Sequence, residues 1–590
     1  MKSLSYLNKY FVKYKWRMLL GVLFIILSNL FAVEMPIFVK TTVDDLLSQG
    51  NQNESVDAFT VFAAIAGIYM LLSLGKGFFL FLTRQTIIIV SRYIEFDLKN
   101  EIYQQYQRLS YTFYKKNNTG DLMNRISEDV TKVRMYLGPG IMYTLNLTAL
   151  FFMVTYKMVQ IDLKLTLLVL VPLPIMSFLI YKVSDKMNAL SGIVQKQQSF
   201  ISTLVQESFS GIRVLKAYTK EPETQAKIDE ASENYKIKQM KLVMVNALFM
   251  PTIVTLIGSS TLITIYVGGQ MIYGDTSHIT YGEIVAFIFF VNMLTWPFAS
   301  VGWVTSIIQR AAASQERINE FLLEKEELSN PTNEPFDFQG EIEFRNVSYT
   351  YPNSDITAVQ DLNFKIKPGQ TLGIVGNTGS GKSTILNLLM RQFDPNEGEI
   401  LVDGKNLNAI NINDLRRQSA VIPQEVFLFS DTIANNIKFG SFTGEATLEE
   451  LEEKTKNAHV YHNIMDFPDQ FETLLGERGV NLSGGQKQRV SIARALLRDP
   501  KLLLMDDCFS AVDTETEEII LNNLKSKIVN NTSVIVSHRI SSLRNADHII
   551  VLENHKIIES GSHESLMTEK GFYFDMYERQ LQEENDTSSN

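Results

Sequence analysis

Apolar residues form long unbroken runs in roughly the first three hundred positions of the chain, whereas later positions alternate short apolar runs with charged stretches. A helix that crosses the hydrocarbon core of a bilayer needs roughly 20 apolar residues. Six runs are long enough, at 18–39, 58–82, 137–160, 163–181, 243–273 and 283–307. We therefore predict six transmembrane helices, since the buried helices of a large soluble protein are a poor explanation for so many runs.

A soluble domain is predicted after the sixth run. Residues 329–339 contain Pro331 and Pro335, which is typical of a linker. Short Val, Ile and Leu strands then alternate with charged helical stretches, which is the pattern of an α/β domain. The sequence thus predicts a polytopic α-helical membrane domain fused to an α/β domain, with these boundaries: membrane domain 1–325, linker 326–341, α/β domain 342–578 and unstructured tail 579–590.

The distribution of Lys and Arg predicts the topology, because these residues collect on the cytoplasmic side of short loops. Lys and Arg are absent from 44–57 and 274–283, and they are frequent in 84–134 and 182–241. Both termini are therefore expected in the cytoplasm. No short apolar stretch with a small-residue cleavage site precedes the first long run, so we expect the amino end to lie at the membrane interface and not to be a cleaved signal.

Glu34 and Lys76 are the two charged residues that this reading places within the apolar runs. Counting ~1.5 Å per helical residue puts them near opposite faces of the bilayer, so we do not expect them to pair. Lys76 is expected to reach the inner interface. Glu34 is then either a cation-sensing residue in a translocation pathway or a structural carboxylate that faces a cavity.

Net charge and cysteine content exclude two further features. The formal net charge of −10 argues against nucleic acid as a partner. Cys508 is the only cysteine, so no disulfide can form within the chain. We expect Cys508 to be a small core residue.

A phosphate-binding loop is predicted near the start of the α/β domain. The segment 376–383 matches G-x-x-x-x-G-K-[ST], with an apolar strand at 372–375 before it and a helical run after it. In such a loop, backbone N–H groups surround phosphate oxygens, the lysine meets the terminal phosphates and the hydroxyl meets Mg²⁺. The residues predicted to bind a nucleotide here are Gly376, Asn377, Thr378, Gly379, Ser380, Gly381, Lys382, Ser383 and Thr384.

A second anion-binding feature lies downstream, at Ser483, Gly484, Gly485 and Gln486. It combines a hydroxyl, two unobstructed backbone N–H groups and the start of a predicted helix, whose amino end favours negative charge. One chain does not need two such cradles for one phosphate tail. The two motifs together resemble the ABC ATPase family, in which the signature of one subunit completes the ATP site of another.

The resemblance implies roles for further residues. Tyr351, followed by Pro352, is similar to the aromatic residue that stacks on adenine. Gln424 resembles the glutamine that touches Mg²⁺, and Asp506 ends a buried strand that resembles the Mg²⁺-binding Walker B strand. ATP and Mg²⁺ are therefore the implied cofactors, with Ser383, Gln424 and Asp506 around the metal.

His538 resembles the histidine of this family that senses the γ-phosphate. It follows the apolar strand 534–537, and ligands of an open α/β sheet bind at such carboxyl ends. We expect the other six histidines to lie on the surface.

Asp507 departs from the family pattern, which has a glutamate at this position to polarise the attacking water. A general base must approach within about 2.6–3.2 Å of the proton it takes, and aspartate is one methylene shorter. Losing a general base typically costs ~10²–10⁴ in rate, or about 3–5 kcal/mol of barrier. We expect a site that binds ATP long before it hydrolyses it, unless a backbone shift brings Asp507 to the water.

Two predicted cytoplasmic stretches, between spans two and three and between spans four and five, are too long to be loops. The first contains Phe113 and Tyr114, and the second contains Gly211 and Arg213. Both resemble the coupling helices of ABC exporters, which dock on the ATPase domain, although plain helical hairpins would show the same periodicity.

Taken as a whole, the chain resembles an exporter-type half-transporter of the ABC family and, through Asp507, the degenerate-site subunit of a heterodimer. The resemblance implies a second half-transporter subunit with a catalytic glutamate, and export of small amphipathic, drug- or lipid-like compounds across a bacterial cell membrane. The alternatives are a homodimeric exporter of lipid or peptide, an ATP-gated channel or receptor, and an importer.

Overall fold

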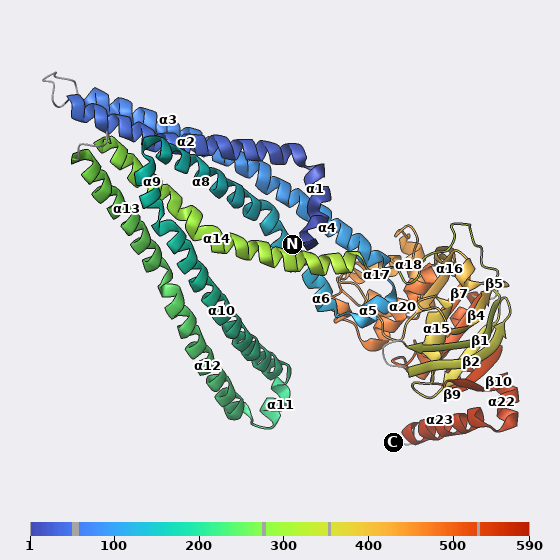
Figure 1. Ribbon diagram of the computed structural model, residues 1–590. Coiled ribbons are helices and arrows are strands. Elements are labelled where there is room, and N and C mark those ends of the chain that lie inside the picture. Colours follow the sequence, from blue (N-terminus) through green and yellow to red (C-terminus); the bar gives the residue numbers. More distant parts are fainter. Residues whose placement is uncertain (1, 50–57, 274–278, 352–355, 528–530, 589–590) are drawn as a thin grey trace. The chain divides into compact units, whose positions relative to one another are not determined.

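The computed structural model describes residues 2–49, 58–273, 279–351, 356–527 and 531–588 (Figure 1). Pro352, His278 as one of the six further histidines, and parts of the predicted loops 44–57 and 274–283 lie outside these ranges. The chain divides into two compact units, each of which is described by itself. The first comprises Met1–Gln107 with Thr119–Glu324, and the second comprises Arg108–Asn118 with Lys325–Asn590.

The first unit contains six helical spans that are long and apolar enough to cross a membrane, which confirms the predicted number within the described residues. Their apolar cores lie in long helices. These are α2 (Lys15–Gln49), α3 (Ala58–Thr83), α8 (Ile141–Ile161), α9 (Leu163–Leu170) with α10 (Pro172–Ser210), α13 (Phe249–Tyr273) and α14 (Tyr281–Leu322).

Shorter helical segments lengthen or join these spans. They are η1 (Lys2–Leu7), α1 (Asn8–Lys13), η2 (Arg84–Ile88), α4 (Ile89–Arg108), α6 (Thr119–Asn124), η3 (Arg125–Asp129), α7 (Val130–Met135), η4 (Tyr136–Gly140), α11 (Ile212–Ala217) and α12 (Glu221–Ala247). α10 alone has 39 residues. At ~1.5 Å per residue it is about 60 Å long, twice the hydrocarbon thickness of a bilayer, so it extends well beyond the membrane.

The buried core of the first unit is built around α14. Phe287, Phe290 and Leu294 follow each other at helical spacing and are fully buried. They share a cluster with Leu165 and Val169 of α9. In contrast, no residue in the most apolar window of the span that contains α3 is buried within the chain. A surface this apolar requires lipid or another protein surface against it.

Glu34 forms an ion pair that the sequence analysis did not foresee, because it did not count Lys157 among the charges of the apolar runs. Its carboxylate accepts a hydrogen bond from Lys157 Nζ of α8 at 2.7 Å. Lys157 falls within the predicted run 137–160, and Lys164 and Glu283 lie at the ends of the runs 163–181 and 283–307, so the sequence analysis overlooked charged residues in these runs. Lys76 is exposed and has no ion pair with Glu34, as expected.

The described strands of the second unit form two sheets. A four-stranded sheet has the order β2-β1-β4-β5, and a six-stranded sheet has the order β10-β9-β3-β8-β7-β6. The strands are β1 (Ile342–Tyr351), β2 (Ile356–Ile366), β3 (Thr371–Gly376), β4 (Glu397–Val402), β5 (Lys405–Asn406), β6 (Ser419–Ile422), β7 (Leu502–Asp506), β8 (Thr532–Val536), β9 (His548–Glu553) and β10 (Lys556–Gly561).

The register of the larger sheet determines where the site lies. β3, β8, β7 and β6 are neighbours and run parallel. Val536 pairs with Asp506 on one side and with Ile374 on the other, so the strands end nearly level. Ligands of open α/β sheets bind at this edge, because the loops after parallel strands meet there. The loops that carry Lys382, Gln424, Asp507 and His538 all leave from it.

Helices cover the two sheets. They are α15 (Lys382–Leu389), α16 (Ile412–Arg417), α17 (Ile433–Lys438), α18 (Leu448–Asn457), α19 (Tyr461–Met465), α20 (Gly484–Leu497), α21 (Thr514–Lys527), α22 (His563–Glu569) and α23 (Phe572–Ser588), with short turns η5 (Leu407–Ala409), η6 (Gln470–Glu472), η7 (Glu477–Gly479) and η8 (Ser541–Leu543). Cys508 is buried in their core, as expected.

Two segments differ from the boundaries expected from sequence. α23 continues through Ser588, beyond residue 578, where the sequence analysis expects an unstructured tail. The short helix α5 (Tyr111–Lys116) belongs to the compact unit of the α/β domain, although it lies inside the predicted membrane domain. The reason is aromatic packing, since the Tyr111 ring lies 5.8 Å from that of Phe393.

Candidate nucleotide site

A cavity of about 270 Å³ opens at the carboxyl edge of the six-stranded sheet and brings many of the predicted residues together. Its lining comes from the phosphate-binding loop, from the ends of β7 and β8, from the loops after β6, β7 and β8, from β1 and β2, and from the turn between β9 and β10. The lining residues are Tyr351, Ile356, Ala358, Thr378, Gly379, Gly381, Lys382, Ser383, Thr384, Gln424, Asp506, Asp507, Val536, His538 and His555.

The loop is shaped for a ligand that the backbone must approach closely. Gly381 has φ +101°, and a Cβ there would lie 2.0 Å from the carbonyl oxygen of Ala358. No side chain could be placed at this position without moving β2. Gly379 has φ +83° and a Cβ there would meet nothing within 4 Å, so its left-handed backbone conformation, and not crowding, favours glycine.

Ser380 tests whether the residues of the loop fit a bound phosphate. Its side chain is only 5% exposed, and its Oγ has no hydrogen-bond partner among the described residues. A buried hydroxyl without a partner is costly, so a native structure normally satisfies it. A phosphate oxygen in the loop would do so, and the residues present therefore fit a nucleotide.

Lys382 lines the cavity, where its ammonium can bind an anion. Its ammonium donates hydrogen bonds to the carbonyl oxygens of Gly376 at 2.8 Å and Asn377 at 2.9 Å. Burial lowers its pKa to about 8, although the carboxylates of Asp507 and Asp506 oppose the shift. A bound triphosphate would favour the charged form, because opposite charge nearby raises the pKa of a lysine.

The three residues predicted around Mg²⁺ lie at one side of the cavity. Ser383 Oγ donates a hydrogen bond to Asp506 Oδ1 at 2.8 Å, and Gln424 reaches the neighbouring carboxylate of Asp507 at 3.3 Å. Burial raises the pKa of Asp506, and the hydrogen bond from Ser383 opposes the shift. Hydroxyl, carboxylate and amide oxygens suit Mg²⁺, which also takes phosphate oxygens and water, so these residues fit the ion.

Asp507 is held by its surroundings. Its backbone has φ +46°, and its N–H group donates to the carbonyl oxygen of Val536 at 2.8 Å. One carboxylate oxygen accepts from the backbone N–H of His538 at 3.4 Å and the other accepts from Gln424 at 3.3 Å. The short side chain therefore stays against the adjacent loops, where a longer glutamate would extend further.

His538 lines the cavity together with Lys382 and the two aspartates. Burial lowers its pKa, and the charge of Lys382 lowers it further. The ring is therefore mainly neutral at neutral pH. A neutral imidazole has one donor and one acceptor nitrogen, so it can donate a hydrogen bond to a phosphate oxygen.

Tyr351 forms one wall of the cavity. Its hydroxyl shares a hydrogen bond with Thr384 Oγ1 at 3.1 Å, and its ring packs edge-on against Tyr349 and Phe393. Lys115 of α5 lies 4.7 Å from the ring centroid, although it does not line the cavity. The ring is thus fixed by aromatic neighbours and by a cation.

The predicted signature, residues 483–486, lies outside this cavity. Ser483 and Gly484 are exposed, and Ser483 forms a capping box with Gln486 at the start of α20. Of the described residues that line the cavity, none comes from 483–486. A single chain therefore does not bring its signature to its own phosphate loop. Gln488, which the sequence analysis did not single out, ties α20 to Ser510 and Ala511 at 3.1 Å each.

Several residues of the cavity were not predicted. His555 was expected on the surface, but it is half-buried and its Nδ1 lies 3.2 Å from the carbonyl oxygen of Ala358. Ile356 and Ala358 of β2 also line the cavity. Ile356 and Ala358 follow Tyr351 in the hairpin of β1 and β2, and His555 lies in the turn between β9 and β10, so no local motif marks these residues.

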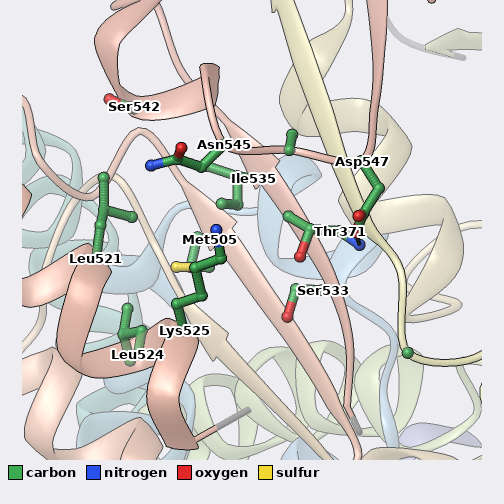
Figure 2. Close-up of a pocket in the computed structure, with 12 residues that line it drawn as sticks. Thr371, Met505, Leu521, Leu524, Lys525, Ser533, Ile535, Ser542, Asn545 and Asp547 are labelled. Atoms are coloured by element: carbon green, nitrogen blue, oxygen red, sulfur yellow. Dashed lines mark hydrogen bonds between the residues drawn. The ribbon is translucent and has the colours of Figure 1, made fainter. Parts of the chain in front are cut away.

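A second cavity of about 290 Å³ lies near the opposite edge of the same sheet (Figure 2). Figure 2 shows side chains of α21 on one side and of the strands on the other. Its lining shares no residue with the first cavity: Gly369, Thr371, Met505, Leu521, Leu524, Lys525, Ser533, Ile535, Ser542, Asn545, Ala546 and Asp547.

Comparison with known proteins finds a matching family for each of the two units. Residues 18–298 match the ABC transporter transmembrane region, and residues 359–510 match the ABC transporter family of ATP-binding domains. The chain is 33% identical to the probable multidrug resistance ABC transporter ATP-binding/permease protein YheI of Bacillus subtilis (98% of this chain, 97% of YheI). It is 32% identical to an ATP-dependent lipid A-core flippase of Pseudoalteromonas translucida (92% of each).

Among solved structures, a bacterial Atm1-family ABC exporter with ATP bound superposes with a TM-score of 0.78 at 25% identity, over 96% of this chain and 98% of that one. Similarity of this extent covers the membrane helices and the ATP-binding domain together. The chain belongs to the ABC transporter family and has the architecture of an exporter-type half-transporter.

Proposed function

We propose that this chain is one half of an ATP-driven exporter of amphipathic, drug- or lipid-like compounds, located in a bacterial cell membrane with both termini in the cytoplasm. The names of two relatives, a probable multidrug resistance transporter and a lipid A-core flippase, support this class of cargo. The absence of Lys and Arg from 44–57 and 274–283 supports the orientation.

The observation that carries the dimer proposal is the separation of the signature from the cavity. Lys382, Asp506 and His538 line one cavity, whereas Ser483 and Gly484 are exposed at the start of α20. A second chain that places its signature over this cavity would complete an ATP site, and this chain's signature would complete the partner's site.

The two sites would be unequal. In this chain's own site, Lys382 binds the terminal phosphates, Ser383, Gln424 and Asp506 hold Mg²⁺, and Tyr351 stacks on adenine. The ion would neutralise charge on the phosphates. Asp507 takes the place of the catalytic base, but its carboxylate is engaged by His538 N–H and Gln424. We infer slow hydrolysis here, and a partner chain with a glutamate at the fast site.

ATPase activity of the purified chain alone tests the proposal. We expect slow turnover that changes little in Asp507→Asn. Asp507→Glu restores the missing methylene, so it is expected to raise turnover by at least about tenfold, because the chain can supply an intact signature to its own copy. ATP binding measured on all variants controls for folding.

Two outcomes would contradict the proposal. Brisk turnover of the isolated chain that is lost in Asp507→Asn would show that Asp507 is an effective base in a homodimer. The second outcome concerns inside-out vesicles that contain both subunits and a fluorescent amphipathic cation. An exporter would accumulate the cation in an ATP-dependent manner. Passive flux of the cation after ATP binding would instead indicate a channel.

A further inference from the structure

The backbone at His538 and just after it is held by a side chain from the C-terminal helix. The N–H group of Ile540 donates a hydrogen bond to Gln580 Oε1 at 2.9 Å. Gln580 Nε2 donates to the carbonyl oxygen of His538 at 2.6 Å. One amide therefore satisfies a donor and an acceptor of the same loop, about forty residues upstream in the chain.

The helix that carries Gln580 is firmly anchored. Tyr573 of α23 is fully buried, and its hydroxyl is 2.8 Å from His563 Nδ1. Its N–H group donates to Glu559 at 2.9 Å. Tyr577 packs against the same hydrophobic core. Gln580 follows Tyr573 and Tyr577 at helical spacing, so it projects from the anchored face of the helix.

A further contact of the loop leads into the nucleotide cavity. The N–H group of His538 donates to Asp507 Oδ1 at 3.4 Å, and His538 itself lines the cavity. The next N–H group, of Arg539, donates to Ser537 Oγ at 2.9 Å. The peptide groups around His538 thus connect the nucleotide side chains to α23.

We propose that Gln580 is a positioning residue that holds His538 in reach of the γ-phosphate, so that the C-terminal helix forms part of the ATP-sensing apparatus. The proposal rests on the inferred role of His538. An amide suits the task because it supplies one donor and one acceptor. Removing it leaves an N–H and a C=O group without these partners, so the loop would relax away from the cavity.

The test compares ATP with ADP, because only ATP carries a γ-phosphate. We would measure binding of both nucleotides, with Mg²⁺, to the purified full-length chain and to Gln580→Ala. One or two lost hydrogen bonds are expected to weaken ATP binding by about three- to tenfold, while ADP binding stays unchanged. Gln582→Ala changes an exposed glutamine two residues further along α23 and is expected to leave both affinities unchanged.

Chain truncation provides an independent variant. A chain that ends at residue 578 lacks Gln580 and is expected to behave as Gln580→Ala does, whereas a chain that ends at 582 is expected to behave as wild type. Hydrogen exchange should rise in a peptide that spans 537–543 in the first truncation and not in the second.

The outcomes distinguish an error about the role of His538 from an error about the role of Gln580. If His538→Ala leaves the ratio of ATP to ADP affinity unchanged, the role of His538 is wrong. If His538→Ala lowers the ratio and Gln580→Ala does not, the role of Gln580 is wrong. Equal loss of ATP and ADP binding in Gln580→Ala would also overturn the proposal, because it would indicate a general structural role.

Discussion

The ammonium of Lys157 in α8 donates a hydrogen bond to the carboxylate of Glu34 in α2 across 2.7 Å. Both residues belong to apolar spans, where an uncompensated charge is costly. Each therefore neutralises the other, and the pair joins two membrane helices. This arrangement favours the structural interpretation of Glu34 over that of a lone carboxylate that senses cations.

A double-mutant cycle tests the pair. Glu34→Gln leaves the ammonium of Lys157 without its carboxylate, and Lys157→Met has the converse effect. We expect each single change to destabilise the protein and the double variant to recover part of the loss, with a coupling free energy of about 0.5–1.5 kcal/mol. Unfolding in detergent measures it. Asp45→Asn neutralises an exposed acid on the same helix and serves as the control. Strictly additive effects would show that the pair contributes nothing.

The six spans could be predicted because each is a local property of the chain, but the pair could not. Counting residues along helices gives the depth of Glu34 and Lys76, and it correctly excludes their pairing. It does not say which helices are neighbours. Lys157 was available in the run 137–160, and only the packing of α2 against α8 reveals it as the partner.

Lys382 predicts how ATP binding depends on pH. Its pKa of about 8 means that it is charged below this pH in the nucleotide-free protein. Above pH 8 it is increasingly neutral, and ATP binding must then take up a proton, because the bound phosphates favour the ammonium. Affinity is expected to be flat from pH 7 to 8 and to fall by up to about tenfold per pH unit above it.

Binding of a labelled ATP analogue between pH 7 and 9.5 measures this dependence. Lys382→Arg keeps its charge over the whole range, so whatever its affinity, the profile should be flat. Lys382→Ala is expected to abolish binding. A flat profile of the wild-type protein would contradict the role of the titrating lysine.

Lys115 is expected to support adenine binding through Tyr351. Its ammonium lies 4.7 Å from the ring centroid, and an attraction of this kind contributes about 0.5–1 kcal/mol at exposed sites. Lys115→Gln is therefore expected to weaken ATP binding by about two- to fivefold. Lys116→Gln, which removes the adjacent charge paired with Glu327, should have little effect.

The dependence on Tyr351 can be isolated. In a Tyr351→Ala background, where no ring is present, Lys115→Gln should cause no further loss of affinity. Independent losses in the two variants would show that Lys115 acts in another way.

The candidate site, like the membrane domain, contains some residues that the local sequence predicts and others that only the fold reveals. The phosphate loop, Asp506, Asp507 and His538 follow strands in the sequence, so local context is enough to place them at one edge of a sheet. Lys115, Gln580 and His555 are brought to the site by α5, α23 and a β-turn, and nothing in the sequence around them indicates a contact with the nucleotide site. Asp507 shows the limit most clearly, since the sequence reveals a shorter acid but not the two hydrogen bonds that engage its carboxylate.

Ser483→Arg tests whether the signature acts on a second chain. The exposed hydroxyl caps α20, and a bulky cation there would occupy the space where a partner's γ-phosphate docks. In the Asp507→Glu background, we expect Ser483→Arg to abolish ATPase activity almost completely. Ser562→Arg makes the same change at another exposed helix cap and should cost little, because a lost cap destabilises by about 1 kcal/mol and this one lies outside the nucleotide site.

Mixing then distinguishes action in trans from action within one chain. Lys382→Ala in the Asp507→Glu background is also expected to be inactive, because its phosphate loop is defective while its signature is intact. In a mixed dimer, the loop of the Ser483→Arg chain meets the signature of the Lys382→Ala chain, so one complete site forms. Co-purified mixtures should therefore recover part of the activity that neither variant shows alone. If the mixture stays inactive although the two chains associate, the shared site would be refuted, because a signature that serves its own chain cannot be rescued by a partner.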